Sequence, residues 1–197
     1  MEELLMILSW IVFYSLHTLL ASSKLKRILE AKWPIQMKSY RLFYSILSSL
    51  LFFGILVQGL FLPFHPLVLP TAFLTYLGYL LSGLGVIIIS RSMKEISFTS
   101  FLGLSTPRKD TFDKLIDHGI YSWMRHPLYL GLVLIFIGYF MVSTTIGSLI
   151  HLVCLVIYLP IGIYFEEKNL LEKFGVTYEN YQKKVPAIFP LKRKKER

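Results

Sequence analysis

The sequence predicts an all-α membrane protein, a polytopic bundle of five transmembrane helices. Two observations indicate this class. Of the 197 residues, 54% are hydrophobic and only 17% are charged, whereas soluble domains carry about 25% charged residues. The hydrophobic residues also gather in five long runs, each bounded by charge, proline or glycine. This composition leaves too little polar surface for a water-soluble globule, so we expect one integral-membrane domain over residues 1–197.

The five apolar runs are the predicted spans. They cover residues 4–21, 42–62, 67–90, 128–142 and 145–165. A spanning helix needs about 20 residues, and four runs reach that length while the fourth is shorter. Only a few small polar residues around Ser143 and Thr144 separate the last two runs. We therefore expect these two helices to form a tight helical hairpin.

The basic residues predict the topology. All 21 lysines and arginines fall in the connection after the first run, in the connection after the third run, or in the C-terminal tail. With five spans these segments share one side, which the positive-inside rule makes cytoplasmic. The N-terminus is then outside and the C-terminus cytoplasmic. The net charge of +9 thus reflects topology and contact with membrane lipids, and we expect no nucleic-acid partner.

Two cytoplasmic segments have enough apolar content to fold. The connection over residues 91–126 is long, and its composition disfavours disorder, so we expect this loop to form part of the site. The tail carries apolar residues at three- and four-residue steps, which predicts a helix that extends beyond the membrane. These residues are Leu170, Leu171, Phe174, Tyr178 and Tyr181.

Small residues predict how the spans pack, because lipid gives helices no hydrophobic reason to associate. Gly131 and Gly138 lie seven residues apart and therefore on one face of the fourth run. The third run offers Gly78, Ser82, Gly83 and Gly85. We expect all six positions to serve helix packing.

The motif Arg125-His126-Pro127 begins the fourth run. Proline favours the first position of a helix, so His126 is expected at the cap, and the free N–H groups of the first turn attract anions such as a carboxylate. Arg125 can give two parallel hydrogen bonds to a carboxylate. The alternative is that Arg125 only reaches toward lipid headgroups.

A carboxylate pair, Glu166-Glu167, ends the fifth run. Helix C-termini prefer cations, so this pair is expected to have a partner, and Arg125 and His126 stand at the same membrane depth. An ion pair that locks the last two spans together is one interpretation. The other is that the carboxylates hold hydroxyls or an ammonium group of a ligand.

Other reactive residues give weaker signals. His17 lies near the cytoplasmic end of the first run, where an intramembrane histidine is a functional candidate, although it could instead hydrogen-bond within the bundle. Cys154, the only cysteine, lies in an apolar run and is expected to act as a small buried hydrophobe. The histidines and the cysteine show no metal-ligand spacing, so no metal is expected.

The ordered motifs of the C-terminal half carry a family resemblance. They read Gly119-x-Tyr121-x3-Arg125-His126-Pro127-x-Tyr129-x-Gly131, then Glu166-Glu167-x2-Leu170-x3-Phe174-Gly175-x2-Tyr178-x2-Tyr181, then Val185-Pro186-x3-Pro190. This half resembles the integral-membrane methyltransferases typified by isoprenylcysteine carboxyl methyltransferase and the phospholipid methyltransferases. The N-terminal half, with Ser15-Leu16-His17-Thr18 and Tyr40-Arg41-Leu42-Phe43-Tyr44, is similar to the branch of methanethiol S-methyltransferases and NnrU-like proteins.

The resemblance implies S-adenosylmethionine as the cofactor and a division into a three-span part, residues 1–90, and a cofactor-binding part, residues 91–197. The implied acceptor is a small or lipid-borne apolar molecule bearing a thiol, an isoprenylcysteine-like carboxylate or a lipid headgroup. Gly162 replaces an arginine of the isoprenylcysteine enzymes, which leaves the acceptor open. Implied cofactor ligands are Asp113, Lys114, Leu115, Ile116, Tyr121, His126, Pro127, Leu128, Tyr129 and Glu166.

Arg125, Glu167 and His17 are the candidate catalytic residues, with Glu167 and His17 as the possible general bases. Two other functions compete with methyl transfer. An NADPH-dependent reductase of the steroid-reductase-like type shares an Arg-His-Pro motif, but Leu128 and Gly131 replace residues that those proteins usually carry. A non-catalytic transport or binding subunit would normally need more ionisable residues within the spans. The oligomeric state is open.

Overall fold

Long helices make up most of the chain. The computed structural model describes residues 1–32, 37–96 and 114–189, and every regular element within these ranges is helical. The helices are α1 Glu2–Ala21, α2 Ser23–Lys32, α3 Met37–Leu60, α4 Ala72–Ile96, the short 3₁₀ helix η1 Gly119–Ser122, α6 Pro127–Ser143, α7 Ile146–Phe174 and α8 Val176–Lys184. The prediction of an all-α fold is confirmed.

Four of the described helices are long and apolar enough to cross a membrane. The qualifying segments are Glu2–Ala21, Leu42–Leu60, Ala72–Ile96 and Ile146–Phe174. Helix α6 is equally apolar but has only 17 residues, which gives a length of about 26 Å. Many large apolar side chains on the outside of the bundle are exposed, as a lipid-facing surface requires. The chain is therefore a multi-pass membrane protein.

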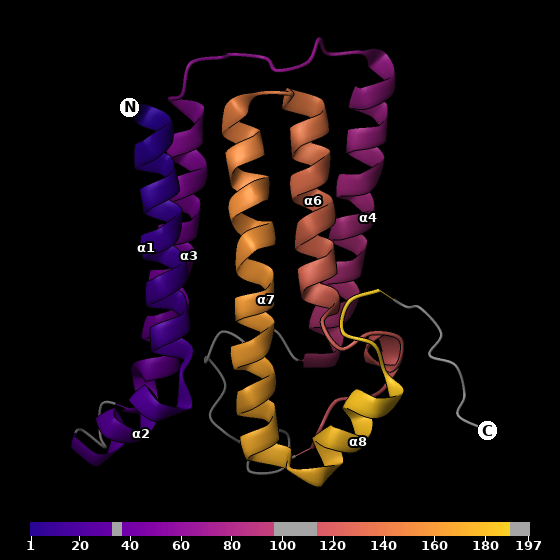
Figure 1. Ribbon diagram of the computed structural model, residues 1–197. Helices are drawn as coiled ribbons and strands as arrows, with labels where there is room; N and C mark the ends of the chain where they lie inside the picture. Colours follow the sequence, from indigo (N-terminus) through magenta and orange to yellow (C-terminus); the bar gives the residue numbers. More distant parts are fainter. Residues whose placement is uncertain (33–36, 97–113, 190–197) are drawn as a thin grey trace.

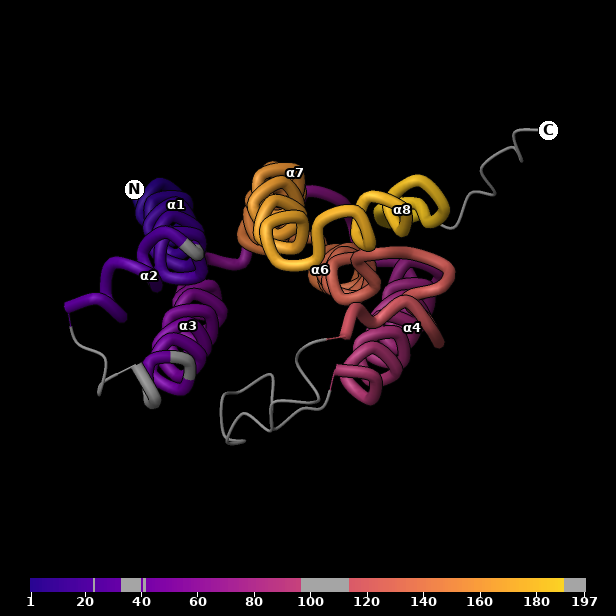
Figure 2. The backbone as a smooth tube through the Cα atoms, turned by 90° about the horizontal axis from the view of Figure 1, so that it is seen from below, coloured from indigo at the N-terminus to yellow at the C-terminus, as the bar shows by residue number. Residues whose placement is uncertain are grey.

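Helix α7 lies between two pairs of helices. On one side α1 packs against α3, and on the other α4 packs against α6, as both views show (Figures 1 and 2). Helix α7 contacts α1 and α6, so it joins the two pairs. Helices α6 and α7 run antiparallel and are connected by Thr144 and Thr145 alone. The predicted division at residue 90 falls inside α4, and it stays a prediction.

Glycines bring α4 and α6 together as expected. A Cβ added at Gly85 would come within 2.5 Å of the Gly131 carbonyl oxygen, and one added at Gly138 would meet Ser82 and the backbone of Gly78. The packing prediction is therefore confirmed for these positions. It is wrong for Gly83, because an added Cβ there meets nothing within 4 Å. Gly83 lies on the exposed face of α4.

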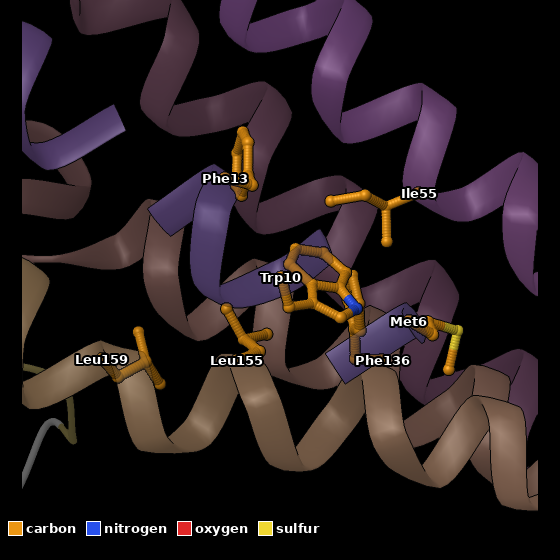
Figure 3. Close-up of a cluster of buried hydrophobic side chains, with 7 residues drawn as sticks. All are labelled: Met6, Trp10, Phe13, Ile55, Phe136, Leu155 and Leu159. Atoms are coloured by element: carbon orange, nitrogen blue, oxygen red, sulfur yellow. The ribbon is translucent and has the colours of Figure 1, made fainter. Parts of the chain in front are cut away.

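The largest buried cluster joins α1, α3, α6 and α7 (Figure 3). It consists of Met6, Trp10, Phe13, Ile55, Phe136, Leu155 and Leu159. Trp10 is its centre, and the indole Nε1 donates a hydrogen bond to His151 Nδ1 at 3.0 Å. This bond satisfies the one polar atom of Trp10 inside the bundle. The cluster fixes α1 against α7 and so positions the N-terminal part relative to the site.

Several helix boundaries differ from the apolar runs. Helix α4 begins at Ala72 rather than at residue 67, because Pro70 precedes it and the Thr71 hydroxyl accepts a hydrogen bond from Leu74 N at 3.3 Å. The predicted tail helix is two helices. Gly175 interrupts it with φ 52° and ψ −129°, a conformation that glycine tolerates and other residues avoid.

After the break at Gly175, α8 turns away from the end of α7 and runs obliquely toward the start of α6 (Figure 1). Tyr178, Tyr181 and Val185 pack there with Leu115 and with residues at the end of α7. Helix α7 itself has 29 residues, about 44 Å, against a hydrocarbon core of about 30 Å. Its last turns, from Glu166 onward, meet α8 at what we term the α8 end of the bundle.

Candidate functional site

The start of α6 is held by the segment that follows α8. Pro127 is the first residue of α6 and His126 is its cap, as predicted. The backbone N–H groups of Arg125 and His126 donate to the carbonyls of Pro186 at 2.9 Å and Ala187 at 2.8 Å. These two bonds fix the backbone of the motif, so its side chains are presented from a rigid base.

The Arg125 guanidinium is held by acceptors on α7, on α8 and just after α8. Its Nε and Nη2 donate to the same oxygen of Glu167, Oε1, at 2.8 and 2.6 Å, and its Nη1 donates to the carbonyls of Gln182 and Val185. Gln182 Nε2 in turn donates to the other Glu167 oxygen at 2.9 Å. The Arg125 side chain is only 10% exposed. Arg125 and Glu167 thus clamp the end of α7 to α6 and α8.

His126 lies between the two carboxylates. Its Nε2 is 3.1 Å from Glu167 Oε1 and its Nδ1 is 3.4 Å from Glu166 Oε2, while its ring packs against that of Tyr129 with centroids 5.5 Å apart. Both ring nitrogens can donate only when the imidazole is charged. Burial alone lowers the pKa of His126, but the hydrogen bonds to Glu166 and Glu167 outweigh it, so the pKa stands above its ordinary value.

The two adjacent glutamates face different surroundings. The Glu167 side chain is 17% exposed and bonds to Arg125 and Gln182, whereas the Glu166 side chain is 47% exposed. Consecutive helical residues point about 100° apart, which explains the difference. The Glu166 carboxylate also interacts with the Tyr129 side chain. Glu166 is therefore the carboxylate that retains accepting capacity for a ligand.

The structure does not bond His17 to this charged group. Its Nδ1 lies 3.2 Å from Ser48 Oγ, and the Tyr44 hydroxyl is 3.1 Å from both ring nitrogens. Next to it, the Thr18 hydroxyl pairs with that of Tyr158 at 2.9 Å. His17 thus belongs to a second, hydroxyl-rich cluster between α1, α3 and α7, near the same end of the bundle.

The remaining predicted ligands lie around the base of α8. Tyr121 is buried, and its carbonyl accepts a hydrogen bond from the Tyr181 hydroxyl at 2.6 Å. Leu115 packs under α8, Ile116 is half-buried and Lys114 is exposed. Asp113 lies outside the described residues. Within the ranges that the structure describes, no group of three acidic, histidine or cysteine residues could hold a metal ion.

Sequence reasoning missed some residues of both clusters. Gln182 and the Val185 carbonyl complete the Arg125 clamp, but a backbone acceptor has no signature in a sequence. Tyr44 and Ser48 position His17. Their signal was available, because a tyrosine and a serine four residues apart share one face of the second apolar run.

Together the helical bundle and its buried charged cluster define an integral-membrane protein with a polar site where α6, α7 and α8 meet. Within that class the chain belongs to the phospholipid methyltransferase family, whose model matches residues 73–177. The match includes Arg125, His126, Glu166 and Glu167. The predicted family resemblance is therefore confirmed.

Similar curated proteins are methyltransferases by name. The chain is 29% identical over 201 residues to methanethiol S-methyltransferase of Crocosphaera subtropica, covering 93% of this chain and 73% of that protein. It is 39% identical over 71 residues to that of Pseudomonas deceptionensis, covering 36% and 26%. It is 28% identical over 118 residues to protein-S-isoprenylcysteine O-methyltransferase of Schizosaccharomyces pombe, covering 57% and 50%. No solved structure matches the chain significantly.

Proposed function

We propose that this protein transfers a methyl group from S-adenosylmethionine to a small or lipid-borne apolar acceptor at the cytoplasmic membrane interface. The observation that carries the proposal is the meeting of Arg125 and His126 with Glu166 and Glu167 at one end of the bundle. These four residues lie inside the part of the chain that matches the family model. A reductase or a transport subunit has no comparable support.

The names of the relatives also indicate methyl transfer, although the alignments cover only part of those proteins. Two of the proteins compared are methanethiol S-methyltransferases, and a third is a protein-S-isoprenylcysteine O-methyltransferase. The alignments cover between 26% and 73% of these relatives. Methyl transfer is common to all three names, while the acceptor differs among them.

The residues at the α8 end suit this cofactor chemically. S-adenosylmethionine carries a carboxylate, an ammonium group and ribose hydroxyls. The first-turn N–H groups of Leu128 and Tyr129 have no acceptor within the helix, and a helix N-terminus favours an anion. The half-exposed Glu166 carboxylate suits an ammonium group or hydroxyls. We propose Tyr121, His126 to Tyr129 and Glu166 as the binding residues, with Asp113 to Ile116 carried over from the resemblance.

The charged residues then have separate roles. When bound, the cofactor supplies a methyl group on a sulfonium centre. Arg125 and Glu167 act as positioning residues, because their polar atoms are used within the clamp. His126 links both carboxylates and holds Glu166 in place. Fixing the reacting groups in line within a site that excludes water lowers the barrier, and orientation contributes several kcal/mol of this effect.

We also propose a topology of five crossings. Helix α6 is the short fourth crossing and forms a hairpin with α7. The N-terminus is outside and the C-terminus cytoplasmic, since all 21 lysines and arginines lie in connections that then share the cytoplasmic side. The α8 end carries the site, so a polar cofactor reaches it from the cytoplasm and an apolar acceptor from the bilayer.

The proposal is tested by incubating purified protein with methyl-labelled S-adenosylmethionine and candidate acceptors and identifying the labelled product. We expect a labelled acceptor and S-adenosylhomocysteine in equal amounts. The Glu166→Gln variant should form much less of both at the same cofactor concentration. Cofactor left unconsumed by the wild type with thiols, prenylated cysteines and membrane lipids alike would contradict the proposal.

A further inference from the structure

Residues 61–71, which we term the α3–α4 connection, form an apolar segment outside the proposed site. Phe61, Phe64 and Leu69 in this segment are 80%, 69% and 81% exposed. The sequence from residue 42 to residue 90 contains no Asp, Glu, Lys or Arg, so neither the connection nor the helix ends beside it carry these charges. An exposed apolar surface of this kind marks contact with another protein or with a membrane.

The α3–α4 connection crosses over the turn between α6 and α7 (Figure 1). Leu67 N donates a hydrogen bond to the Thr144 carbonyl at 2.7 Å, and Pro66 forms an antiparallel bridge with Thr145. Leu62 lies against the first turn of α7. Thr144 is only 2% exposed, although a turn at the end of two helices would ordinarily face the surroundings. The connection therefore covers the α6–α7 turn.

Backbone groups of the α6–α7 turn are paired within the protein. Thr144 N donates to the Phe140 carbonyl at 2.7 Å. The Thr145 hydroxyl accepts from Ser148 N at 3.3 Å, and the Ser148 hydroxyl donates to the Thr145 carbonyl at 2.8 Å. The α3–α4 connection also contains three prolines, each of which removes an N–H donor. Non-helical backbone is tolerated at membrane depth when it is paired and buried in this way.

Helix α6 is too short to carry this turn across a bilayer. Its 17 residues give about 26 Å, whereas the hydrocarbon core is about 30 Å thick. The helix begins at the charged cluster of Arg125 and His126, and such charges are costly within the hydrocarbon. A helix that starts at one surface and is shorter than the core ends among acyl chains. The segment that covers the α6–α7 turn must therefore suit a lipid environment.

We propose that the α3–α4 connection is a lipid-embedded cap, lying where acyl chains meet headgroups in the leaflet opposite the α8 end. Its exposed apolar side chains enter the bilayer, and the α6–α7 turn lies beneath it. Leu60 and Phe73, at the adjoining helix ends, are 74% and 72% exposed. The apolar surface of the spans thus continues onto the cap without a polar boundary. Tyr76, also exposed, is of a residue type enriched at the membrane interface.

The bilayer is the occupant that accounts for these features together. A partner protein would explain the exposed side chains, but it would explain neither the shortness of α6 nor the pairing of the covered turn. The bundle then has two unlike ends. The α8 end carries the charged site and contacts water, while the capped end is apolar and embedded in lipid.

The depth of the cap is measured with nitroxide labels on single cysteines, in a Cys154→Ser background of the full chain reconstituted in phosphatidylcholine vesicles. Phe64→Cys and Leu69→Cys place labels on the cap, where replacing an exposed side chain removes little packing. Ile157→Cys is the lipid control, because Ile157 is 65% exposed in the middle of α7. Asn180→Cys, on the exposed face of α8, is the water control. Oxygen, which concentrates in lipid, and a water-soluble nickel chelate are the two relaxing agents.

We expect both cap labels to resemble the label at Ile157, with high accessibility to oxygen and low accessibility to the chelate. An oxygen-to-chelate ratio nearer to the Asn180 value would overturn the inference, because the cap would then face water. Low accessibility to both agents would also overturn it, since protein would then cover the cap, and dipolar broadening between labels would identify a second copy as the cover. Either cap position alone decides the test if the other variant does not fold.

Discussion

Glu166 and Glu167 show how neighbouring residues of one type acquire different roles. Glu167 is enclosed by Arg125, His126 and Gln182, whereas Glu166 contacts His126 and Tyr129 and remains half-exposed. The sequence predicted that the carboxylate pair would meet Arg125 and His126. It could not predict which carboxylate faces which partner, because that depends on the rotation of α7 about its axis.

Removing the Glu167 charge should destabilise the protein. Breaking a buried ion pair by removing one partner costs about 3–5 kcal/mol, because Arg125 is then left buried without its counter-charge. Glu172→Gln is the matched control, since Glu172 lies on the same helix and its contact with Arg27 is exposed. We expect thermal unfolding in detergent to show a clear loss of Tm for Glu167→Gln and almost none for Glu172→Gln. Similar Tm values for the two variants would contradict the clamp.

The environment of His126 predicts a direction of pH dependence. Its pKa is raised in the folded protein above the ordinary 6.5, so the stabilisation is fully present below pH 6.5 and is lost as pH rises through the folded-state pKa. We expect the Tm difference between wild type and His126→Gln to shrink as pH increases from this value. Thermal unfolding of both proteins across a pH series measures it. A difference that grows with pH would show that His126 is held neutral.

At the scale of helices, hydrophobic pattern predicted where apolar segments lie but not where helices end. Helix α7 continues past its apolar run to Phe174, because polar side chains do not stop a helix. The apolar spacing continues across Gly175, because Tyr178 and Tyr181 remain buried after the chain turns there. Apolar spacing indicates which residues are buried, and the apolar residues of α8 are buried against Leu115 and the end of α7.

The contact between α4 and α6 should be sensitive to single methyl groups. Gly138→Ala would push a Cβ into Ser82 and the backbone of Gly78, and overpacking costs about 1–3 kcal/mol. Gly83→Ala is the control on the same pair of helices, because its Cβ would meet nothing within 4 Å. We expect a lower Tm for Gly138→Ala and an unchanged or slightly higher one for Gly83→Ala. Equal Tm values for the two variants would mean that α4 and α6 pack more loosely than the structure indicates.

At the scale of the molecule, α7 connects the two halves that the proposed reaction needs. Its first half carries His151, which receives the hydrogen bond of Trp10 from α1, and its other end carries the carboxylates that meet α6. The apolar runs and the position of the charges were enough to predict the membrane class and the meeting of Arg125 and His126 with the carboxylate pair. The order of the helices around α7 was not predictable, because it arises from side-chain packing such as the Trp10 cluster (Figure 3).

The most direct test of the proposed cofactor site is calorimetric titration of detergent-purified protein with S-adenosylmethionine and S-adenosylhomocysteine. We expect saturable binding of both to the wild type and to Glu172→Gln. Glu166→Gln should bind at least about tenfold more weakly, a loss of about 1.4 kcal/mol, with an unchanged Tm. Absence of binding to the wild type, or undiminished affinity in Glu166→Gln, would contradict the placement of the cofactor at the α8 end.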